Sequence, residues 1–213
     1  MKKGLLLCGY ACSAWIWDGV KDRLEKEYDI DIIEWPNELI GTFNKVEDFA
    51  EWTINNYSAL NTKIDFIVGH SMGGVIALYI AASKKVKVNK VVLVESFIRS
   101  PDKFFQNRVY DEANKDLILK ITDMIKNEAQ YYSSEIGNEL SCLNVAELAY
   151  NLDCDIYAIY GDRGCGNKER VISELAFNQE VNRKVEVDII SNSCHFPMLE
   201  NENEVVEYLN RTL

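Results

Sequence analysis

The sequence has few basic residues, two histidines and no long apolar run. Lys and Arg total 23 against 34 Asp and Glu, which gives a net charge of −11. A chain this acidic repels phosphate backbones and anionic lipid, so we expect no nucleic-acid partner. A membrane-spanning helix needs about 18 or more consecutive apolar residues, and the sequence contains no such run. We therefore expect a globular protein without a nucleic-acid or membrane partner.

The sequence also lacks clustered metal ligands, a phosphate-binding glycine loop and the cysteine pattern of a small secreted protein. Its six cysteines are scattered through 213 residues, whereas disulfide frameworks belong to short secreted chains. We expect reduced thiols in a cytoplasmic protein, with no metal and no cofactor. The apolar run Leu5–Cys8 is much shorter than a signal-peptide core of roughly 7 to 15 residues, so it is interpreted as a buried strand.

Length and composition limit the chain to one domain. With 47% hydrophobic and 27% charged residues, it can form one core but is too short for two catalytic domains. No internal repeat and no Pro- or Gly-rich linker divides it. We therefore interpret residues 1–213 as a single domain.

Short apolar runs alternate with helical patterns along most of the chain. This alternation predicts an α/β fold, a three-layer α/β/α sandwich with a mostly or fully parallel sheet of about six strands. The expected strands are Lys3–Gly9, Asp29–Glu34, Ile64–Gly69, Val88–Glu95, Asp155–Gly161 and Val185–Ser191. The expected helices are Asp18–Glu27, Val46–Leu60, Met72–Ser83, Lys168–Phe177 and Glu202–Leu209.

The strand pattern stops between Phe97 and Leu152. Within this stretch, Glu112–Tyr131 has apolar residues at helical spacing. We expect residues 97–152 to form an inserted helical lid and not a second domain.

The most specific motif is the G-x-S-x-G element Gly69–Gly73, which follows the expected strand directly and precedes a helix. A sharp strand-to-helix turn holds the middle residue, Ser71, at strained dihedral angles. Its hydroxyl is then projected above the carboxyl edge of the sheet, where the first amides of the helix can stabilise an oxyanion. An ordinary serine in a glycine-rich turn is the alternative interpretation.

Three blocks of the sequence resemble the α/β-hydrolase superfamily, in the family's order and over Gly4–Leu209. The first, Leu5–Tyr10, resembles the His-Gly loop after the family's first central strand, with Cys8 in place of the usual histidine. The second is the G-x-S-x-G element, and the third, Ser193–Glu200, is similar to the Gly-His-Phe-Pro segment that carries the catalytic histidine. The chain looks like a small serine esterase, similar to carboxylesterases and to enzymes that hydrolyse methyl esters of carrier-bound acyl chains.

The resemblance implies that Ser71 is the nucleophile and His195 its general base. An imidazole has an ordinary pKa near ~6.5, so its neutral form can accept the serine proton at physiological pH. The other histidine, His70, lies inside the G-x-S-x-G element, where we expect a structural role. The backbone N–H groups of Tyr10 and Met72 would form the oxyanion hole.

The acid of the expected triad is ambiguous, because the family's usual position holds Gly164. Asp162 lies two positions earlier in the same loop. Glu95 ends the preceding expected strand, in a segment that resembles the Glu-Phe-Ile-Arg segment of haloalkane dehalogenases, whose nucleophile is an aspartate. Both carboxylates stay open as candidates, as does a serine–histidine pair without an acid.

These parts imply acyl transfer to water through an acyl-enzyme on Ser71. We expect the substrate to be a small-molecule carboxylic ester, or a thioester, with an apolar acyl part. A non-catalytic ligand-binding or interaction protein on a hydrolase fold is one alternative. A carbon–carbon bond hydrolase with the same serine is another.

Aromatic residues are the candidates for substrate binding, with lid-to-core packing as their alternative role. They are Trp15, Phe97, Phe104 and Tyr131. The first expected strand begins at Lys3, without the hairpin that family members usually carry before it. We expect the exposed sheet edge to be covered by a helix or by a second subunit of a homo-oligomer.

Overall fold

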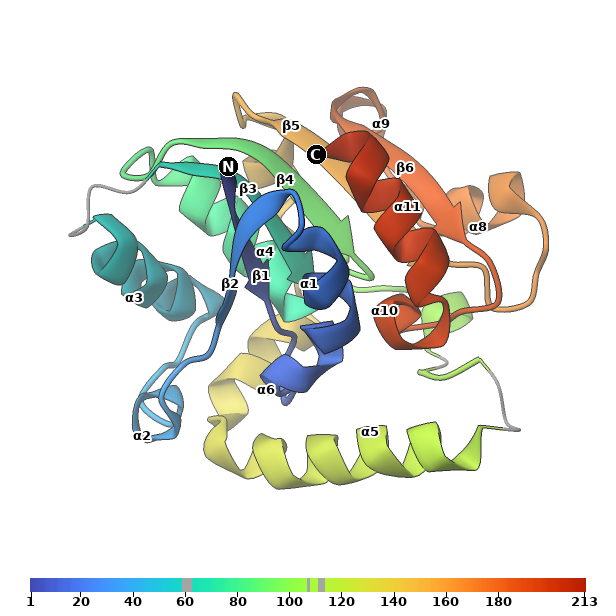
Figure 1. Cartoon of the computed structure of the whole chain (residues 1–213), viewed down its shortest axis with the longest axis horizontal. Helices are drawn as coiled ribbons and strands as arrows, with labels where there is room; N and C mark the ends of the chain where they lie inside the picture. The colour runs from blue at the N-terminus through green and yellow to red at the C-terminus, as the bar shows by residue number, and fades with distance from the viewer. Residues whose placement is uncertain (59–62, 107, 111–113) are drawn as a thin grey trace.

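The computed structural model describes residues 1–58, 63–106, 108–110 and 114–213, and a six-stranded sheet forms its centre (Figure 1). The strands lie in the order β2-β1-β3-β4-β5-β6, and every neighbouring pair is parallel. Their bounds are β1 (Lys2–Leu7), β2 (Tyr28–Ile33), β3 (Ile64–His70), β4 (Val88–Val94), β5 (Asp155–Gly161) and β6 (Val185–Ile190). The predicted α/β class and parallel sheet are confirmed.

Burial differs between the central and the edge strands. Leu5–Leu7 in β1 and Val91–Val94 in β4 are completely buried, because helices cover both faces of the sheet. The edge strands β2 and β6 mix buried and partly exposed positions. Pairing of the β2 edge with a second subunit stays a prediction.

Helices cover both faces of the sheet and complete the three layers. On one face α1 (Asp18–Leu24) packs against α11 (Glu202–Thr212), and on the other α3 (Val46–Ser58) packs against α4 (Met72–Ala82) (Figure 1). The shorter elements are η1 (Ala14–Trp17), α2 (Asn37–Ile40), α8 (Lys168–Glu174), α9 (Gln179–Lys184) and α10 (Pro197–Glu200). Of the expected helices, α1 and α8 end three residues early and α11 continues three residues further, while Leu60 lies outside the described residues.

The chain between β4 and β5 leaves the sheet and folds mainly into helices. They are η2 (Lys103–Phe105), α5 (Lys115–Glu128), η3 (Ala129–Tyr131), α6 (Ser134–Ser141) and α7 (Ala146–Tyr150). The side chain of Asn114 caps α5 by accepting a hydrogen bond from the amide of Leu117. In Figure 1, α5 runs across the carboxyl ends of the strands. Glu112, where the sequence places the start of this helix, lies outside the described residues.

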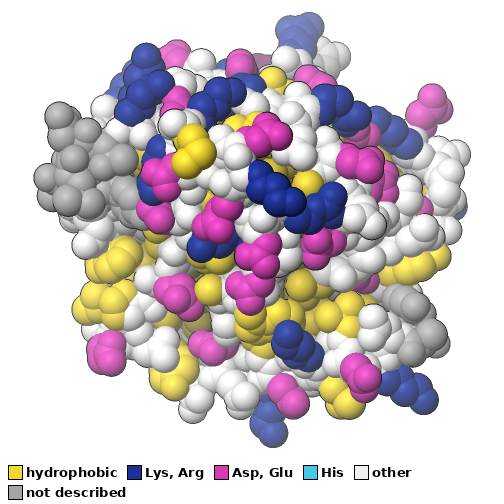
Figure 2. All heavy atoms as spheres, in the orientation of Figure 1, with side chains coloured by type: hydrophobic (Ala, Val, Ile, Leu, Met, Phe, Trp, Pro, Cys, Tyr) yellow, Lys and Arg dark blue, Asp and Glu magenta, His cyan; other side chains and the backbone are white. Residues whose placement is uncertain are grey.

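The surface carries charged side chains of both signs (Figure 2), and the cysteines of the described chain form no disulfide. Figure 2 shows charged side chains of both signs over the upper half of one face, and hydrophobic side chains in a band nearer to α5. All six cysteines, each within the described residues, are free thiols. Among the helices that the structure describes, none has both the length and the apolar character needed to cross a membrane.

Candidate active site

Ser71 lies in a strained turn between β3 and α4, at the carboxyl edge of the sheet. Its φ is 51° and its ψ is −122°, in a region that residues with a Cβ rarely adopt. Its amide donates to the carbonyl of Val94 at 2.9 Å, and its carbonyl accepts from the amide of Gly74 at 3.0 Å. These bonds hold the turn between β4 and the first turn of α4.

Glycines flank Ser71 because the backbones approach too closely for a side chain. A Cβ added at Gly69 would lie 2.4 Å from the backbone of Gly73. A Cβ added at Gly73 would lie 2.6 Å from the carbonyl oxygens of Leu7 and Cys8 in the adjacent chain segment. The packing of β1, β3 and α4 at this point therefore accounts for both glycines of the motif.

The loop after β6 carries His195, whose backbone is held on both sides. Its amide donates to the carbonyl of Arg108 at 3.1 Å, and its carbonyl lies 2.8 Å from Nε2 of His70. Because a carbonyl can only accept, Nε2 of His70 carries the proton. The imidazole of His195 is 21% exposed and lies nearly parallel to the ring of Phe97, with the centroids 6.5 Å apart.

Glu95 is the carboxylate in contact with this imidazole. It follows β4 directly, its side chain is fully buried, and its Oε2 lies 3.3 Å from Nδ1 of His195. Its Oε1 accepts from the amide of Gly161 at 2.6 Å. Burial by itself raises the pKa of Glu95, but hydrogen bonds from Arg163 and His195 outweigh it and hold that pKa below its ordinary value. Glu95 is therefore ionised at neutral pH.

Asp162, the other candidate acid, faces its own loop. Its Oδ1 accepts from the amide of Gly164 at 2.9 Å, and its carbonyl accepts from the amide of Cys165 at 2.8 Å. This is the turn-capping arrangement of an Asp side chain. Of the two carboxylates, the structure brings Glu95 to His195 and leaves Asp162 capping a turn.

The two amides of the expected oxyanion hole, those of Met72 and Tyr10, belong to segments next to Ser71. Met72 is the first residue of α4, so its amide has no acceptor within the helix. Gly9 precedes Tyr10, and a Cβ added at Gly9 would lie 2.9 Å from the Cβ of Ser71. The loop that carries the amide of Tyr10 thus lies against the serine, as the expected oxyanion hole requires.

Ser71 and His195 line one cavity of about 210 Å³. Among the described residues no hydrogen bond joins the Ser71 hydroxyl to the His195 ring, and such bonds are often long in the absence of substrate. Most of the other lining side chains are apolar. They are Met72, Val75, Phe97, Pro101, Phe105, Gln106, Arg108, Leu140 and Leu143.

Of the four aromatic residues predicted to bind substrate, only Phe97 belongs to the described lining of this cavity. The ring of Trp15 lies 3.8 Å below the ammonium group of Lys120. Phe104 packs edge-to-face on Phe105, and Tyr131 is 37% exposed at the end of the α5 region. These three side chains are not in the described lining of this cavity, and their contact with substrate stays a prediction.

Leu140 of α6 is a wall residue that the sequence did not single out. No helix boundary was predicted around it, because the helical spacing of apolar residues found in this segment ends at Tyr131, before α6 begins. The neighbouring Leu143 belongs to the same wall.

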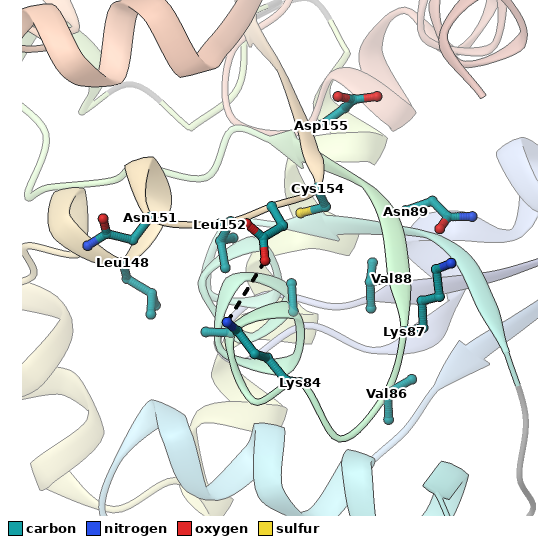
Figure 3. Close-up of a pocket in the computed structure, with 13 residues that line it drawn as sticks. Lys84, Val86, Lys87, Val88, Asn89, Leu148, Asn151, Leu152, Cys154 and Asp155 are labelled. Atoms are coloured by element: carbon teal, nitrogen blue, oxygen red, sulfur yellow. Dashed lines mark ion pairs between the residues drawn. The ribbon is translucent and has the colours of Figure 1, made fainter.

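A larger cavity, of about 640 Å³, lies at the opposite edge of the sheet (Figure 3). Its wall includes Val88 and Asp155 at the starts of β4 and β5, together with Leu148 of α7. One ion pair crosses it, between Lys84 and Asp153 at 3.9 Å, and both side chains are largely exposed. Ligands of parallel sheets bind at the carboxyl ends of the strands, so the smaller cavity at Ser71 is the better candidate.

His70 and Cys8, two ionisable groups near Ser71, are held in their neutral forms. Burial and the neighbouring His195 lower the pKa of His70 well below its ordinary value. Burial raises the pKa of the Cys8 thiol well above its ordinary value, which disfavours the thiolate needed for nucleophilic attack. Within the part of the chain that the structure describes, no group of three or more His, Cys, Asp or Glu could hold a metal ion.

A parallel sheet, a serine at a strained strand-to-helix turn and a histidine after the last strand together define an α/β-hydrolase. The sequence profile of the alpha/beta hydrolase fold family matches residues 5–194, which is most of the chain. The chain therefore belongs to this family. No curated protein sequence matches it.

Solved structures of esterases share the fold at low sequence identity. An esterase from Exiguobacterium antarcticum superposes with a TM-score of 0.78 at 13% identity, over 100% of this chain and 91% of that one. A thermophilic esterase from Thermogutta terrifontis has a TM-score of 0.72 at 15% identity, over 99% of this chain and 89% of that one. The carboxylesterase CesB from Bacillus subtilis has a TM-score of 0.72 at 14% identity, over 98% of this chain and 82% of that one. At such identities the likeness describes the fold.

Proposed function

We propose that this protein is a serine hydrolase that cleaves a carboxylic ester through an acyl-enzyme on Ser71. The observation that carries the proposal is that a strained serine shares a cavity with His195, whose Nδ1 lies 3.3 Å from the buried carboxylate of Glu95. Three side chains from three separate strand ends thus converge at one edge of the sheet. The esterases and the carboxylesterase that share the fold support the same class of reaction.

Each group has a role in the proposed reaction. His195 takes the proton of the Ser71 hydroxyl as the serine attacks the ester carbonyl, and it returns this proton to the departing alcohol. The amides of Tyr10 and Met72 donate to the oxyanion. Glu95 accepts from Nδ1–H, which holds the ring with Nε2 toward the serine and stabilises the imidazolium. Water then attacks the acyl-enzyme by the same steps, and the carboxylic acid leaves.

The cavity supports a substrate with a small apolar acyl part. Its volume of about 210 Å³ is below the roughly 300 to 1,000 Å³ of pockets for drug-sized ligands. Phe97, Phe105 and Leu143 come from residues 97–152, which we propose act as a lid over Ser71. Gln106 and Arg108 are the polar lining residues from the same segment.

Hydrolysis of p-nitrophenyl esters of graded chain length tests the proposal. The parent protein should turn over the short acyl esters, whereas S71A, folded to the same extent by circular dichroism, should fall to the buffer rate. D162N is the matched control for E95Q, because both remove one carboxylate charge near the site. Turnover in S71A equal to that of the parent would contradict the assignment of the nucleophile.

A non-catalytic ligand-binding role is the second candidate, favoured by the missing hydrogen bond between Ser71 and His195. The same cavity would then bind a small apolar molecule without converting it. Saturable binding of an uncleaved ester, with no product released over many hours, would support this second candidate and contradict the first.

A further inference from the structure

We propose that Arg163 is a positioning residue for the catalytic pair, fixing Glu95 beside His195 and setting the pH range in which the pair works. The proposal rests on the proposed function of Ser71 and His195. The cation is Arg163 and the candidate acid is Glu95. Arg163 lies in the loop after β5, where Gly164 occupies the family's usual acid position.

The guanidinium of Arg163 forms a bidentate ion pair with Glu95. Nη1 donates to Oε1 at 2.8 Å and Nη2 donates to Oε2 at 2.5 Å, in the planar fork geometry that only arginine provides. Nη1 also donates to the carbonyl of Gly161 at 2.8 Å. The Arg163 side chain is 3% exposed and that of Glu95 is 0% exposed, so water does not weaken the pair. The carboxylate that faces His195 therefore has one fixed orientation.

The backbone of Arg163 joins the same cluster. Its φ is 53°, and its amide donates at 2.9 Å to the carbonyl of Ser193, two residues before His195. Its guanidinium carbon lies 4.6 Å from the ring centroid of Phe105, a wall residue of the cavity at Ser71. One side chain thus contacts the acid and the cavity wall, while its backbone holds the histidine loop.

The other groups around the pair do not replace this cation. The titratable groups around Glu95 and His195 on the packed elements are His70, Tyr160, Cys194 and Glu200, with Arg108 next to His195 through its backbone carbonyl and Asp162 turned into its own loop. Burial raises the pKa of Tyr160 and of Cys194, and it lowers that of His70, so all three are neutral at pH 7. Among the described residues, Arg163 is the only Lys or Arg in an ion pair with Glu95.

Removing this cation changes how tightly the pair holds protons. With Arg163 present, the charge of Glu95 is largely compensated, so it attracts a proton to His195 less strongly. Without it, a buried and uncompensated carboxylate would hold a proton on His195 more strongly. The base is then protonated at a higher pH, and the lower end of the active pH range is lost.

Two readouts of R163Q and R163K test the proposal, with R170Q, a change at an exposed arginine of α8, as the matched control. The first is the pH dependence of kcat/KM for a short p-nitrophenyl ester. The second is the NMR titration of the His195 imidazole, which needs no activity. The chain has only two histidines, and H70Q identifies the signals of the other one.

In R163Q, both the acid limb of kcat/KM and the His195 titration should move upward by about one pH unit. R163K keeps the charge but loses the fork, so its midpoints should stay near those of the parent while kcat falls about tenfold with KM nearly unchanged. R170Q should match the parent in all respects. If R163Q does not fold, R163K alone decides.

Unchanged midpoints in folded R163Q, or a parental kcat in R163K, would overturn the role of Arg163. Failure of the proposed function looks different, because the parent protein would then hydrolyse no ester. In that case the His195 titration of R163Q still tests whether Arg163 controls protonation of the pair.

Discussion

His70 donates a hydrogen bond from Nε2 to the carbonyl oxygen of His195 at 2.8 Å, which joins the turn at Ser71 to the loop that carries His195. The two rings also lie close together, with their centroids 4.8 Å apart. His70 is completely buried. Residues 125 positions apart in the sequence are thereby held in one arrangement.

Replacing His70 should affect both the positioning of His195 and the stability of the fold, and the effect on His195 should be the larger. In H70F the His195 carbonyl loses its donor, which should destabilise the protein by about 1–3 kcal/mol and lower kcat about tenfold. In H70Q the amide nitrogen can replace Nε2, so we expect partial recovery of both quantities. Urea denaturation and steady-state kinetics measure them. Equal losses of kcat in the two variants would contradict a role through this hydrogen bond.

The stability of the fold should fall as the pH decreases below about 6.5, the ordinary pKa of histidine. Burial lowers the pKa of His70 in the folded state, so in this range the unfolded chain binds more protons and stability rises with pH. The slope extends down to the folded pKa of His70. The comparison of urea midpoints from pH 5 to 8 should show a flatter profile in H70Q than in the parent. An identical slope in the two proteins would contradict this origin.

Glu95 should add a second, more acidic phase to the same curve. Its pKa is lowered in the folded state by the hydrogen bonds that outweigh its burial. Its contribution is therefore present above the ordinary glutamate pKa of about 4.3 and lost as the pH falls through the folded value. This phase should be missing in E95Q and kept in D162N, and acid titrations of circular dichroism measure it.

Two glycines offer a matched test of the close backbone approach at the strained turn. G73A would place a Cβ 2.6 Å from the carbonyl oxygens of Leu7 and Cys8, so we expect a large loss of both stability and turnover. G137A adds the same methyl group to α6, where nothing lies within 4 Å. It should stabilise the protein by up to about 1 kcal/mol and leave turnover unchanged. A tolerated G73A would contradict the described packing of β1 against α4.

The residues of the proposed lid should set the preferred acyl chain length. L143A enlarges the cavity at Ser71, because Leu143 lies in its wall. The optimum of kcat/KM should move to acyl chains one or two carbons longer. L119A removes the same atoms from a residue of α5 that is 59% exposed, so it should leave the optimum unchanged. The series of p-nitrophenyl esters measures both variants, and the same optimum in L143A and the parent would place the acyl group elsewhere.

The parts of the fold that follow from local chemistry could be predicted from the sequence. Continuous apolar runs such as Val91–Val94 define the central strands, and the glycines beside Ser71 mark the turn that follows β3. Element ends were less accurate, as at α8, because tertiary contacts decide where the last turn ends. The boundaries of α6 were not predicted from the sequence, although Ser133 lies at its N-cap position.

The choice of the candidate acid could not be predicted from the sequence, because it depends on how side chains are directed in the folded protein. Glu95 and Asp162 each follow a strand directly, at the same edge of the sheet, so both remained alternatives at the level of the sequence. The choice depends on side-chain direction: Glu95 has a φ of 48° and reaches Nδ1 of His195, whereas Asp162 bonds to the amide of Gly164. The contact of Arg163 with Glu95 spans 68 positions and has no local signature.

Covalent labelling of Ser71 is the most direct test of the proposed nucleophile. The folded protein is treated with a fluorophosphonate and the site of any adduct is determined by mass spectrometry, with S71A as the control. One adduct on Ser71, absent from S71A and formed much more slowly in H195Q, is the result that the account predicts. A folded protein that forms no adduct on Ser71 would contradict it.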